Sequence, residues 1–377
     1  MQNADPKQKI CAILPGLFSE SGHIYHYHLS VQRAVESLGW KYAALVPKDN
    51  KIKVLPPNWI PVLANDFWDR PKTFFPRLGS LFRNFSPIRR FFRGEEKNSD
   101  AVIFIEHFEL QNLASLCLSL CFLNPCFQFW ILHRFAYGKM HFKTLIFRAF
   151  HWYLRKKLGK DRFRILTDSD LLAGLYRDYF SFPVDVVPIP HTSIGEKIKK
   201  KGPLLFWWPG AAIHEDRGLL SIQKLTKALR DPDMYQLVLA EKGKGFFPIS
   251  PSLLYIPSLL SSDEYNQWMR TADLVLLPYS AASYAHRTSG IFVEAVCLGS
   301  TPVVSRGTWM AYELAKYDLF ELVLDQEQFE SPDCLTSLVT DPKIFKKLER
   351  MRSEYRRFHS EKGFAAALIK ANRERTV

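Results

Sequence analysis

Residues 286–304 read HRTSGIFVEAVCLGSTPVV, and the pattern around them decides the fold class. The preceding residues 272–279 (ADLVLLPY) are almost entirely apolar, which predicts a buried strand. Residues 290–298 predict a short amphipathic helix that stops at a glycine, and residues 301–305 (TPVVS) predict the next parallel strand. This βαβ unit places a polar loop, residues 280–289, at the carboxyl edge of the sheet, where open parallel sheets bind their ligands.

The end of this loop carries groups that suit a phosphorylated sugar. Thr288 and Ser289 are candidate N-caps, so free backbone N–H groups around Gly290 would point to the ligand side and attract phosphate. Arg287 adds a fixed positive charge beside them. Glu294 follows about one helical turn later, where its carboxylate could accept hydrogen bonds from both hydroxyls of a ribose. The alternative interpretation is an ordinary βαβ unit with a glutamate at its buried edge.

The segment SGIFVEAVCLGSTPVVS resembles the donor-binding signature of GT-B glycosyltransferases, in particular the large retaining class close to family 4. In that class the nucleotide is bound by a helix that carries a glutamate and is followed by a small-residue turn and PVV. The resemblance therefore implies that Glu294 binds the ribose. The class has another glutamate eight positions earlier, where this chain has His286, and a phenylalanine–glycine step where it has Thr288 and Ser289. The resemblance implies two Rossmann-like, doubly wound α/β domains that face an interdomain cleft. It implies a nucleotide-sugar as a substrate, and no cofactor.

Composition and strand spacing support a chain of two domains. The 377 residues are 47% hydrophobic, and their six cysteines form no CxxC pair, so neither a zinc site nor a disulfide framework is expected. The polar first nine residues predict no secretory signal and a cytoplasmic protein. Strands are predicted in the first half at residues 9–14, 40–46, 101–105, 126–132, 164–167 and 184–189. The apolar residues 113–132 could span a bilayer, but Asn124 and Pro125 favour a buried helix followed by a strand.

The resemblance to GT-B enzymes also guides the domain boundaries. Residues 1–190 form the predicted N-terminal acceptor domain, and the lysine-rich residues 191–203 form the hinge. Residues 204–345 form the predicted donor domain. Residues 346–377 are expected to form a C-terminal helix that crosses back to the first domain.

Two residues of the first domain are candidates for the site. The loop after the first strand resembles the glycine loop of GT-B enzymes, in which Gly22 would allow close approach to the donor. His107 follows a buried strand and is the catalytic candidate beside the reacting sugar, with a capping role as the alternative. Glu106 shares its position at the strand end, and the pair His133 and Arg134 has a similar but weaker claim.

Two patterns that suggest a metal are interpreted otherwise. Three histidines fall within residues 23–28, but no carboxylate accompanies them, so no metal is predicted. The string DSD at residues 168–170 matches a metal–diphosphate motif, yet Ser169 and Asp170 are better explained as helix caps.

The second domain supplies a further phosphate contact. In the family an arginine and a lysine near glycines face the donor diphosphate. Here Arg217, followed by Gly218, fits the lysine position, and Ala211 occupies the arginine position. The resemblance therefore implies that Arg217 contacts phosphate. The alternative is a surface arginine that pairs with Glu215 or Asp216.

The formal net charge of +13 is concentrated in two segments. Residues 67–93 mix seven cations with aromatic side chains, and residues 141–160 predict a basic amphipathic helix. Both segments suit an anionic membrane surface, with a solvated basic face over a normal core as the alternative. Nucleic acid is the less favoured partner.

Together these features predict a hexosyltransferase-like enzyme that moves a sugar from a nucleotide-sugar donor to an acceptor hydroxyl. The resemblance implies a retaining, metal-independent reaction in glycan, lipopolysaccharide or glycolipid synthesis, with a glycan or lipid-linked acceptor at the inner face of the membrane. The residues assigned to the site are His107 for catalysis and, for donor binding, Gly22, Arg217, Arg287, Ser289, Gly290 and Glu294. A GT-B nucleotide-sugar epimerase and a non-catalytic GT-B-like binding protein stay open as alternatives.

Overall fold

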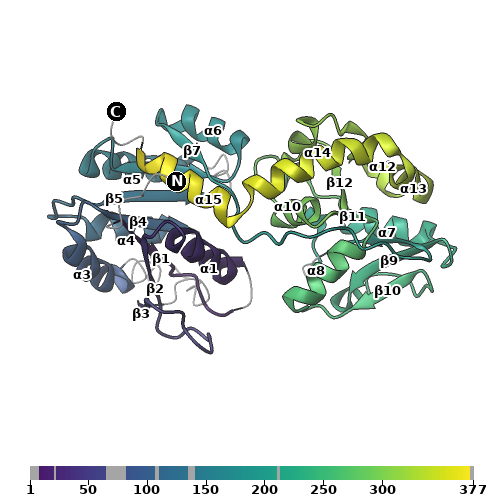
Figure 1. Cartoon of the computed structure of the whole chain (residues 1–377), viewed down its shortest axis with the longest axis horizontal. Coiled ribbons are helices and arrows are strands. Elements are labelled where there is room, and N and C mark those ends of the chain that lie inside the picture. The colour runs from purple at the N-terminus through teal and green to yellow at the C-terminus, as the bar shows by residue number, and fades with distance from the viewer. Residues whose placement is uncertain are drawn as a thin grey trace. The chain divides into compact units, whose positions relative to one another are not determined.

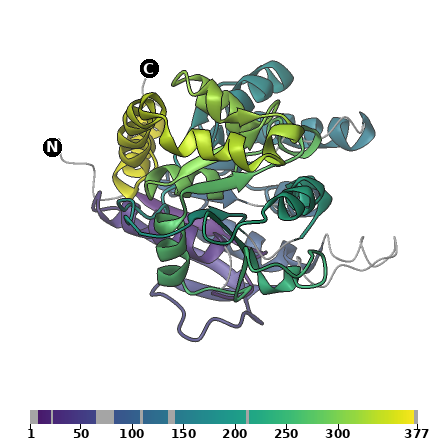
Figure 2. The same cartoon turned by 90° about the vertical axis from the view of Figure 1, so that its right-hand side faces the viewer.

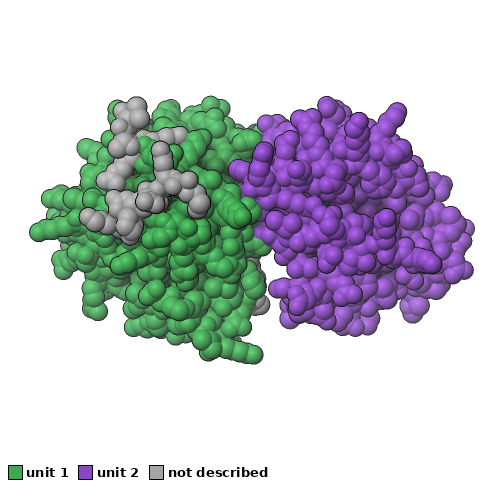
Figure 3. Space-filling view, in the orientation of Figure 1, with its two compact units in different colours: residues 1–191, 360–377 green, residues 192–359 purple. Residues whose placement is uncertain are grey.

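The computed structural model describes residues 8–20, 23–64, 82–106, 110–134, 141–209 and 213–373. The chain forms two α/β units, each built on one parallel sheet (Figure 1). Unit 1 comprises residues 1–191 and 360–377, and unit 2 comprises residues 192–359 (Figure 3). Each unit is described on its own below.

Unit 1 contains a seven-stranded sheet with the order β3-β2-β1-β4-β5-β6-β7, and every pairing is parallel. Its strands are β1 (Lys9–Ile13), β2 (Lys41–Pro47), β3 (Trp59–Leu63), β4 (Ala101–Glu106), β5 (Gln128–His133), β6 (Phe163–Thr167) and β7 (Val184–Val186). The central strands β4 and β5 are buried along their whole length, which explains their unbroken apolar runs.

Helices cover both faces of this sheet because successive strand residues point to opposite sides. Ile103 of β4 belongs to the core formed with α3 (Phe85–Glu95), α4 (Leu110–Ser119), α5 (His141–Leu158) and α6 (Asp170–Phe180). The next residue, Phe104, belongs to the opposite core, formed with α1 (His23–Glu36) and α15 (Glu361–Arg373). Unit 1 is therefore doubly wound.

Unit 2 contains a six-stranded parallel sheet with the order β10-β9-β8-β11-β12-β13. Its strands are β8 (Leu204–Trp207), β9 (Tyr235–Ala240), β10 (Leu253–Ile256), β11 (Leu274–Leu277), β12 (Thr301–Ser305) and β13 (Val323–Leu324). Its helices are η1 (Glu215–Arg217), α7 (Leu219–Ala228), η2 (Glu241–Gly243), α8 (Ser262–Thr271), α9 (Ala281–Tyr284), α10 (Gly290–Cys297), α11 (Trp309–Ala315), η3 (Phe320–Leu322), α12 (Gln326–Phe329), α13 (Pro332–Thr340) and α14 (Pro342–Phe358). Figure 2 shows the same elements turned by 90°.

The strand order reverses between β8 and β11 in unit 2, and between β1 and β4 in unit 1. At such a switch point the loops that follow the two strands diverge, which leaves a crevice at the carboxyl edge of the sheet. The predicted donor segments follow β8 and β11, so the structure places both of them at the switch point of unit 2.

The structure confirms the predicted alternation of strands and helices and corrects it at three places. Edge strand β3 was not predicted, because Pro61 breaks its pattern, although an edge strand tolerates proline. The segment expected to be a loop, residues 280–289, contains helix α9. The basic residues at the C-terminal end form two helices, α14 and α15, instead of one.

Residues 113–132 are divided between α4 and β5, as predicted. None of the helices in the described ranges combines the length and the apolar character that a membrane crossing requires.

Candidate functional site

The turn that carries Arg217 is locked against the end of β11. Gly218 has φ +84°, and a Cβ built there would lie 2.2 Å from the carbonyl oxygen of Pro278. The backbone N–H of Ser280 donates to the carbonyl of Asp216 at 2.8 Å. Only glycine fits this approach, so Gly218 fastens the segment after β8 to the segment after β11.

Two arginines flank a pair of tyrosines at this edge. The guanidinium of Arg217 lies 5.9 Å from the ring centroid of Tyr279, and that of Arg287 lies 5.1 Å from the ring of Tyr284. The two rings are 4.5 Å apart, so the four side chains form a row. Neither arginine has a carboxylate partner within the described ranges, Glu215 and Asp216 included. The row therefore presents two cations, neither of which forms an ion pair with a carboxylate in the described part of the chain.

The hydroxyl of Tyr279 is an unusual feature of this row. The side chain is 2% exposed, and its hydroxyl has no hydrogen-bond partner among the residues that the structure describes. Burial raises the pKa of Tyr279, while Arg217 and Arg287 act in the opposite direction. A buried hydroxyl without a partner costs about 1–3 kcal/mol, so the fold retains a donor that a bound acceptor group would satisfy.

Helix α10 begins beside the row. Ser289 is its N-cap, and the Ser289 Oγ accepts from the backbone N–H of Phe292 at 3.3 Å. The capping prediction is thus correct for Ser289 and wrong for Thr288, which precedes the cap. Ser289 is buried and Gly290 is exposed, and the other N–H groups of the first turn have no partner within the helix. This terminus favours a negative charge.

Glu294 lies one turn into α10 and pairs with α8. The hydroxyl of Tyr265 donates to Oε2 of Glu294 at 2.8 Å, which leaves Oε1 for a ligand. Burial raises the pKa of Glu294 to about 7, and the hydrogen bond from Tyr265 partly offsets this rise. Burial and the nearby Glu294 carboxylate raise the pKa of Tyr265 well above its usual value. The carboxylate is therefore oriented by a tyrosine, and its pKa is raised by burial.

His286 occupies the position at which the resemblance expects a glutamate. Its side chain is half-buried, and Nδ1 is a buried atom without a hydrogen-bond partner in the described part of the chain. An imidazole here can donate or accept a hydrogen bond, whereas a glutamate would carry a negative charge next to Arg287.

The candidates Gly22 and His107 lie outside the described residues, as does Ala211.

Unit 1 also holds a buried ionic cluster that the sequence did not reveal as a unit. Arg134 Nη2 lies 3.3 Å from Glu106 Oε1, and Arg134 Nε lies 3.8 Å from Asp168 Oδ2. His28 Nε2 lies 3.1 Å from the other oxygen of Glu106, and the guanidinium stacks 4.2 Å above the ring of Tyr27. Burial acts to lower the pKa of Arg134, but the neighbouring carboxylates raise it. Glu106 ends β4, and Arg134 and Asp168 directly follow the neighbouring strands β5 and β6, so all three lie at the same edge of the sheet. A charged residue at the end of each strand is the only signal of this cluster in the sequence.

His133 has a different role from its neighbour Arg134. It is 2% exposed, and its Nε2 lies 3.1 Å from Nε2 of His151 among aromatic core residues. Burial lowers the pKa of both imidazoles, that of His151 to about 3. The suggestion that His133 serves a ligand is therefore wrong, because its ring is enclosed in the core.

Ser169 and Asp170 lie at the start of α6. The Oγ of Ser169 caps α6 by accepting from Leu172 at 3.1 Å, as predicted, and Asp170 begins the helix. Over the ranges that the structure describes, no group of three His, Cys, Asp or Glu side chains could hold a metal ion.

Comparison with known proteins relates the fold of the chain to solved structures. No family model and no curated protein sequence matches the chain. The N-terminal domain of Candida albicans trehalose-6-phosphate phosphatase matches with a TM-score of 0.67 and 13% identity, over 100% of this chain and 98% of that one. The α,α-trehalose 6-phosphate synthase of Burkholderia multivorans matches with a TM-score of 0.67 and 10% identity, over 98% of each chain.

An α-glucosyltransferase in complex with UDP-glucose and DNA matches with a TM-score of 0.58 and 12% identity, over 98% of this chain and all of that one. The chain has the GT-B fold. This fold agrees with the predicted pair of doubly wound α/β domains, whereas membership of family 4 stays a prediction.

Proposed function

We propose that the chain is a glycosyltransferase whose unit 2 binds the nucleotide-sugar donor. The observation that carries the proposal is the meeting, at one switch point, of two arginines without an ion pair in the described residues, a helix N-terminus and an oriented carboxylate. A nucleoside diphosphate sugar needs this combination, because its phosphates are anionic and its ribose hydroxyls are hydrogen-bond donors.

In this proposal the donor diphosphate occupies the row of Arg217 and Arg287 and the N-terminus of α10 at Ser289 and Gly290. Transfer leaves negative charge on the diphosphate while positive charge develops at the sugar carbon. Fixed cations and backbone N–H groups stabilise that leaving group without a metal. His107 is proposed to lie beside the reacting sugar, and Gly22 is proposed to let the N-terminal loop approach the donor closely. The retention of configuration is inferred from the resemblance alone.

Glu294 is proposed to hold the ribose through the oxygen that Tyr265 leaves free. The ionised carboxylate is the better acceptor for two hydroxyl groups. Since its pKa is about 7, binding of the nucleotide should strengthen as the pH rises through neutrality.

The test is thermal unfolding of the wild type and of Glu294→Ala with UDP, GDP, dTDP, CMP and ADP. UDP comes first because one similar structure holds UDP-glucose. A ligand at 100 times its dissociation constant stabilises a protein by about 2.7 kcal/mol, so one nucleotide should raise the wild-type melting temperature by several degrees. This rise should disappear in Glu294→Ala.

A matched control exists in the same unit. Glu354 accepts a hydrogen bond from the hydroxyl of Tyr317 at 2.9 Å, which reproduces the tyrosine–carboxylate pair away from the strand ends. Glu354→Ala should keep the full nucleotide response. If no nucleotide shifts the wild type, or if Glu294→Ala responds like the control, the donor site is not where we propose it.

A binding protein without catalysis is the second candidate, and His286 favours it because it replaces a glutamate of the resembled signature. Nucleotide binding with neither donor hydrolysis nor sugar transfer would favour this candidate. Donor turnover without an acceptor would favour an epimerase.

A further inference from the structure

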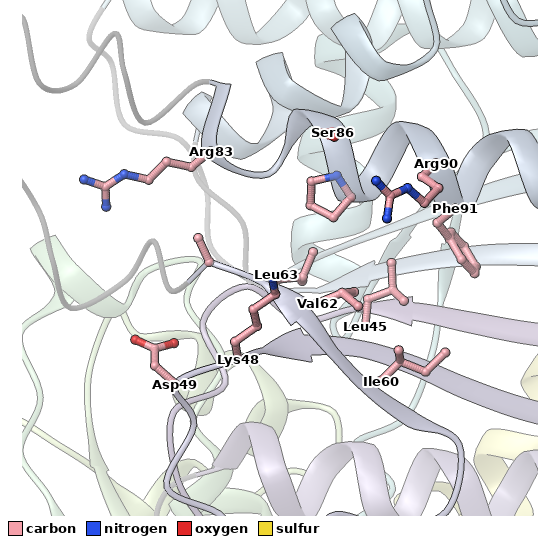
Figure 4. A pocket seen from close by; sticks show the side chains of 12 residues that line it. Leu45, Lys48, Asp49, Ile60, Val62, Leu63, Arg83, Ser86, Arg90 and Phe91 are labelled. Carbon is pink, nitrogen blue, oxygen red and sulfur yellow. The ribbon is translucent and has the colours of Figure 1, made fainter.

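A cavity of about 850 Å³ lies in unit 1 (Figure 4). One wall is formed by the ends of β2 and β3, and the other by the start of α3. Pockets for small ligands typically measure about 300–1,000 Å³, so this cavity has room for a molecule of that class.

The two walls are joined by a buried asparagine. The side-chain oxygen of Asn84 accepts from the backbone N–H of Ala64 at 2.7 Å, and its amide nitrogen donates to the Ala64 carbonyl at 3.1 Å. Lys48 N–H also donates to the carbonyl of Leu63 at 2.9 Å, which ties β2 to β3 at the rim. The cavity is therefore bounded by fixed backbone.

The rim of the cavity is cationic. Lys48 directly follows β2, Arg83 lies just before α3, and Arg90 lies on α3 (Figure 4). Asp49 is the one acid among the lining residues, and none of the three cations forms an ion pair in the described part of the chain. All three side chains are exposed, so they can converge on an anion that enters from solvent.

The floor of the cavity is apolar. Its lining includes Leu45 of β2, Ile60, Val62 and Leu63 of β3, and Phe91 of α3. The side chain of Ile60 is 42% exposed to solvent. Burial of this apolar side chain against a ligand would be favourable. A hydrocarbon chain that lay over this floor would remove it from water while its charged end met the cations.

We propose that this cavity binds the acceptor, and that the acceptor is an organic phosphate that carries an apolar chain. The three cations recognise the phosphate, and the floor of β3 and α3 recognises the chain. The role of this molecule as the acceptor rests on the proposed transferase function. Its binding to the cavity can be tested independently of that function, because binding requires no nucleotide.

The test is calorimetric titration of the full chain with octyl phosphate below its micelle concentration, without nucleotide. Octyl glucoside, which lacks the phosphate, and inorganic phosphate, which lacks the chain, are the comparison ligands. Octyl phosphate should bind at least about tenfold more tightly than either, and its affinity should fall as the salt concentration rises from 50 to 200 mM. If octyl glucoside bound as tightly as octyl phosphate, the cations would not recognise the phosphate. If inorganic phosphate bound as tightly as octyl phosphate, the apolar floor would not recognise the chain.

Two double variants place the site. Arg83→Gln with Arg90→Gln should weaken octyl phosphate binding at least about tenfold. Arg89→Gln with Arg93→Gln removes the same charge from α3 at positions that do not line the cavity, and it should leave the affinity unchanged. Equal loss in both would mean only a general charge effect. Absence of any octyl phosphate binding would refute the proposal and leave the nucleotide response of unit 2 as a separate result.

Discussion

The hydroxyl of Tyr265 lies 2.8 Å from the carboxylate of Glu294 and orients it at the switch point of unit 2. The two side chains come from different helices, α8 and α10. This bond fixes one carboxylate oxygen and leaves the other for a ligand, so it connects the packing of unit 2 to the proposed ribose contact.

Glu294 should make stability depend on pH. Its pKa is raised in the folded protein to about 7 from an ordinary value of 4.5, so the ionised form is disfavoured by folding. The stability that protonation provides is present below about pH 4.5 and is lost as the pH rises to 7. Glu294→Gln should therefore gain stability relative to the wild type between pH 5 and pH 8, by on the order of 1–2 kcal/mol.

Urea unfolding of both proteins at several pH values measures this difference. A constant difference between wild type and Glu294→Gln across this range would contradict the raised pKa.

Gly218→Ala should destabilise unit 2. The added Cβ would lie 2.2 Å from the Pro278 carbonyl and would sit at φ +84°, so both a clash and backbone strain are introduced. We expect a loss of more than about 2 kcal/mol in the free energy of unfolding. Gly202→Ala is the control, because its φ is +103° but nothing lies within 4 Å of the added atom. Similar losses in the two variants would show that the contact with Pro278 is not important.

Tyr279→Phe should separate stability from ligand binding. The variant removes a buried hydroxyl that has no described partner, so the free protein should keep or slightly increase its stability. If that hydroxyl donates to the diphosphate, affinity for the nucleoside diphosphate should fall about five- to thirtyfold while affinity for the nucleoside stays the same. Tyr235→Phe, at the amino end of β9, should change neither affinity. An unchanged diphosphate affinity in Tyr279→Phe would remove Tyr279 from the site.

Arg134→Met should be strongly destabilising. Glu106 and Asp168 are 2% and 3% exposed, and loss of the guanidinium would remove the arginine that faces both buried carboxylates, although His28 still contacts Glu106. Such losses cost about 3–5 kcal/mol. Arg33→Met breaks the exposed pair with Glu361 in the same unit and should cost less than about 1 kcal/mol. Chemical denaturation measures the loss in free energy of unfolding of both variants. A loss for Arg134→Met as small as that for Arg33→Met would contradict the stabilising role of the buried cluster.

Much of the fold could be predicted from sequence because it depends on local patterns. Unbroken apolar runs such as those of β4 and β5 predict strands buried on both faces. The caps at Ser169 and Ser289 depend on hydroxyl groups within three residues of the N–H groups they accept from. The βαβ unit around Glu294 was predictable for the same reason.

Local sequence patterns were sufficient to predict the alternation of strands and helices and the caps at Ser169 and Ser289, since periodicity and turn chemistry act over short distances. The order of the strands, and with it the two switch points, came from the three-dimensional structure. Tertiary structure alone decided which distant groups meet. The close approach of Gly218 to Pro278, which only a glycine permits, joins two segments that are separated in the chain. The hydrogen bond between Tyr265 and Glu294 does the same. The ionic cluster around Arg134 and the cavity beside Asn84 arise in the same way. These contacts depend on how adjacent strands and helices are placed in space, and no spacing along one segment encodes that placement.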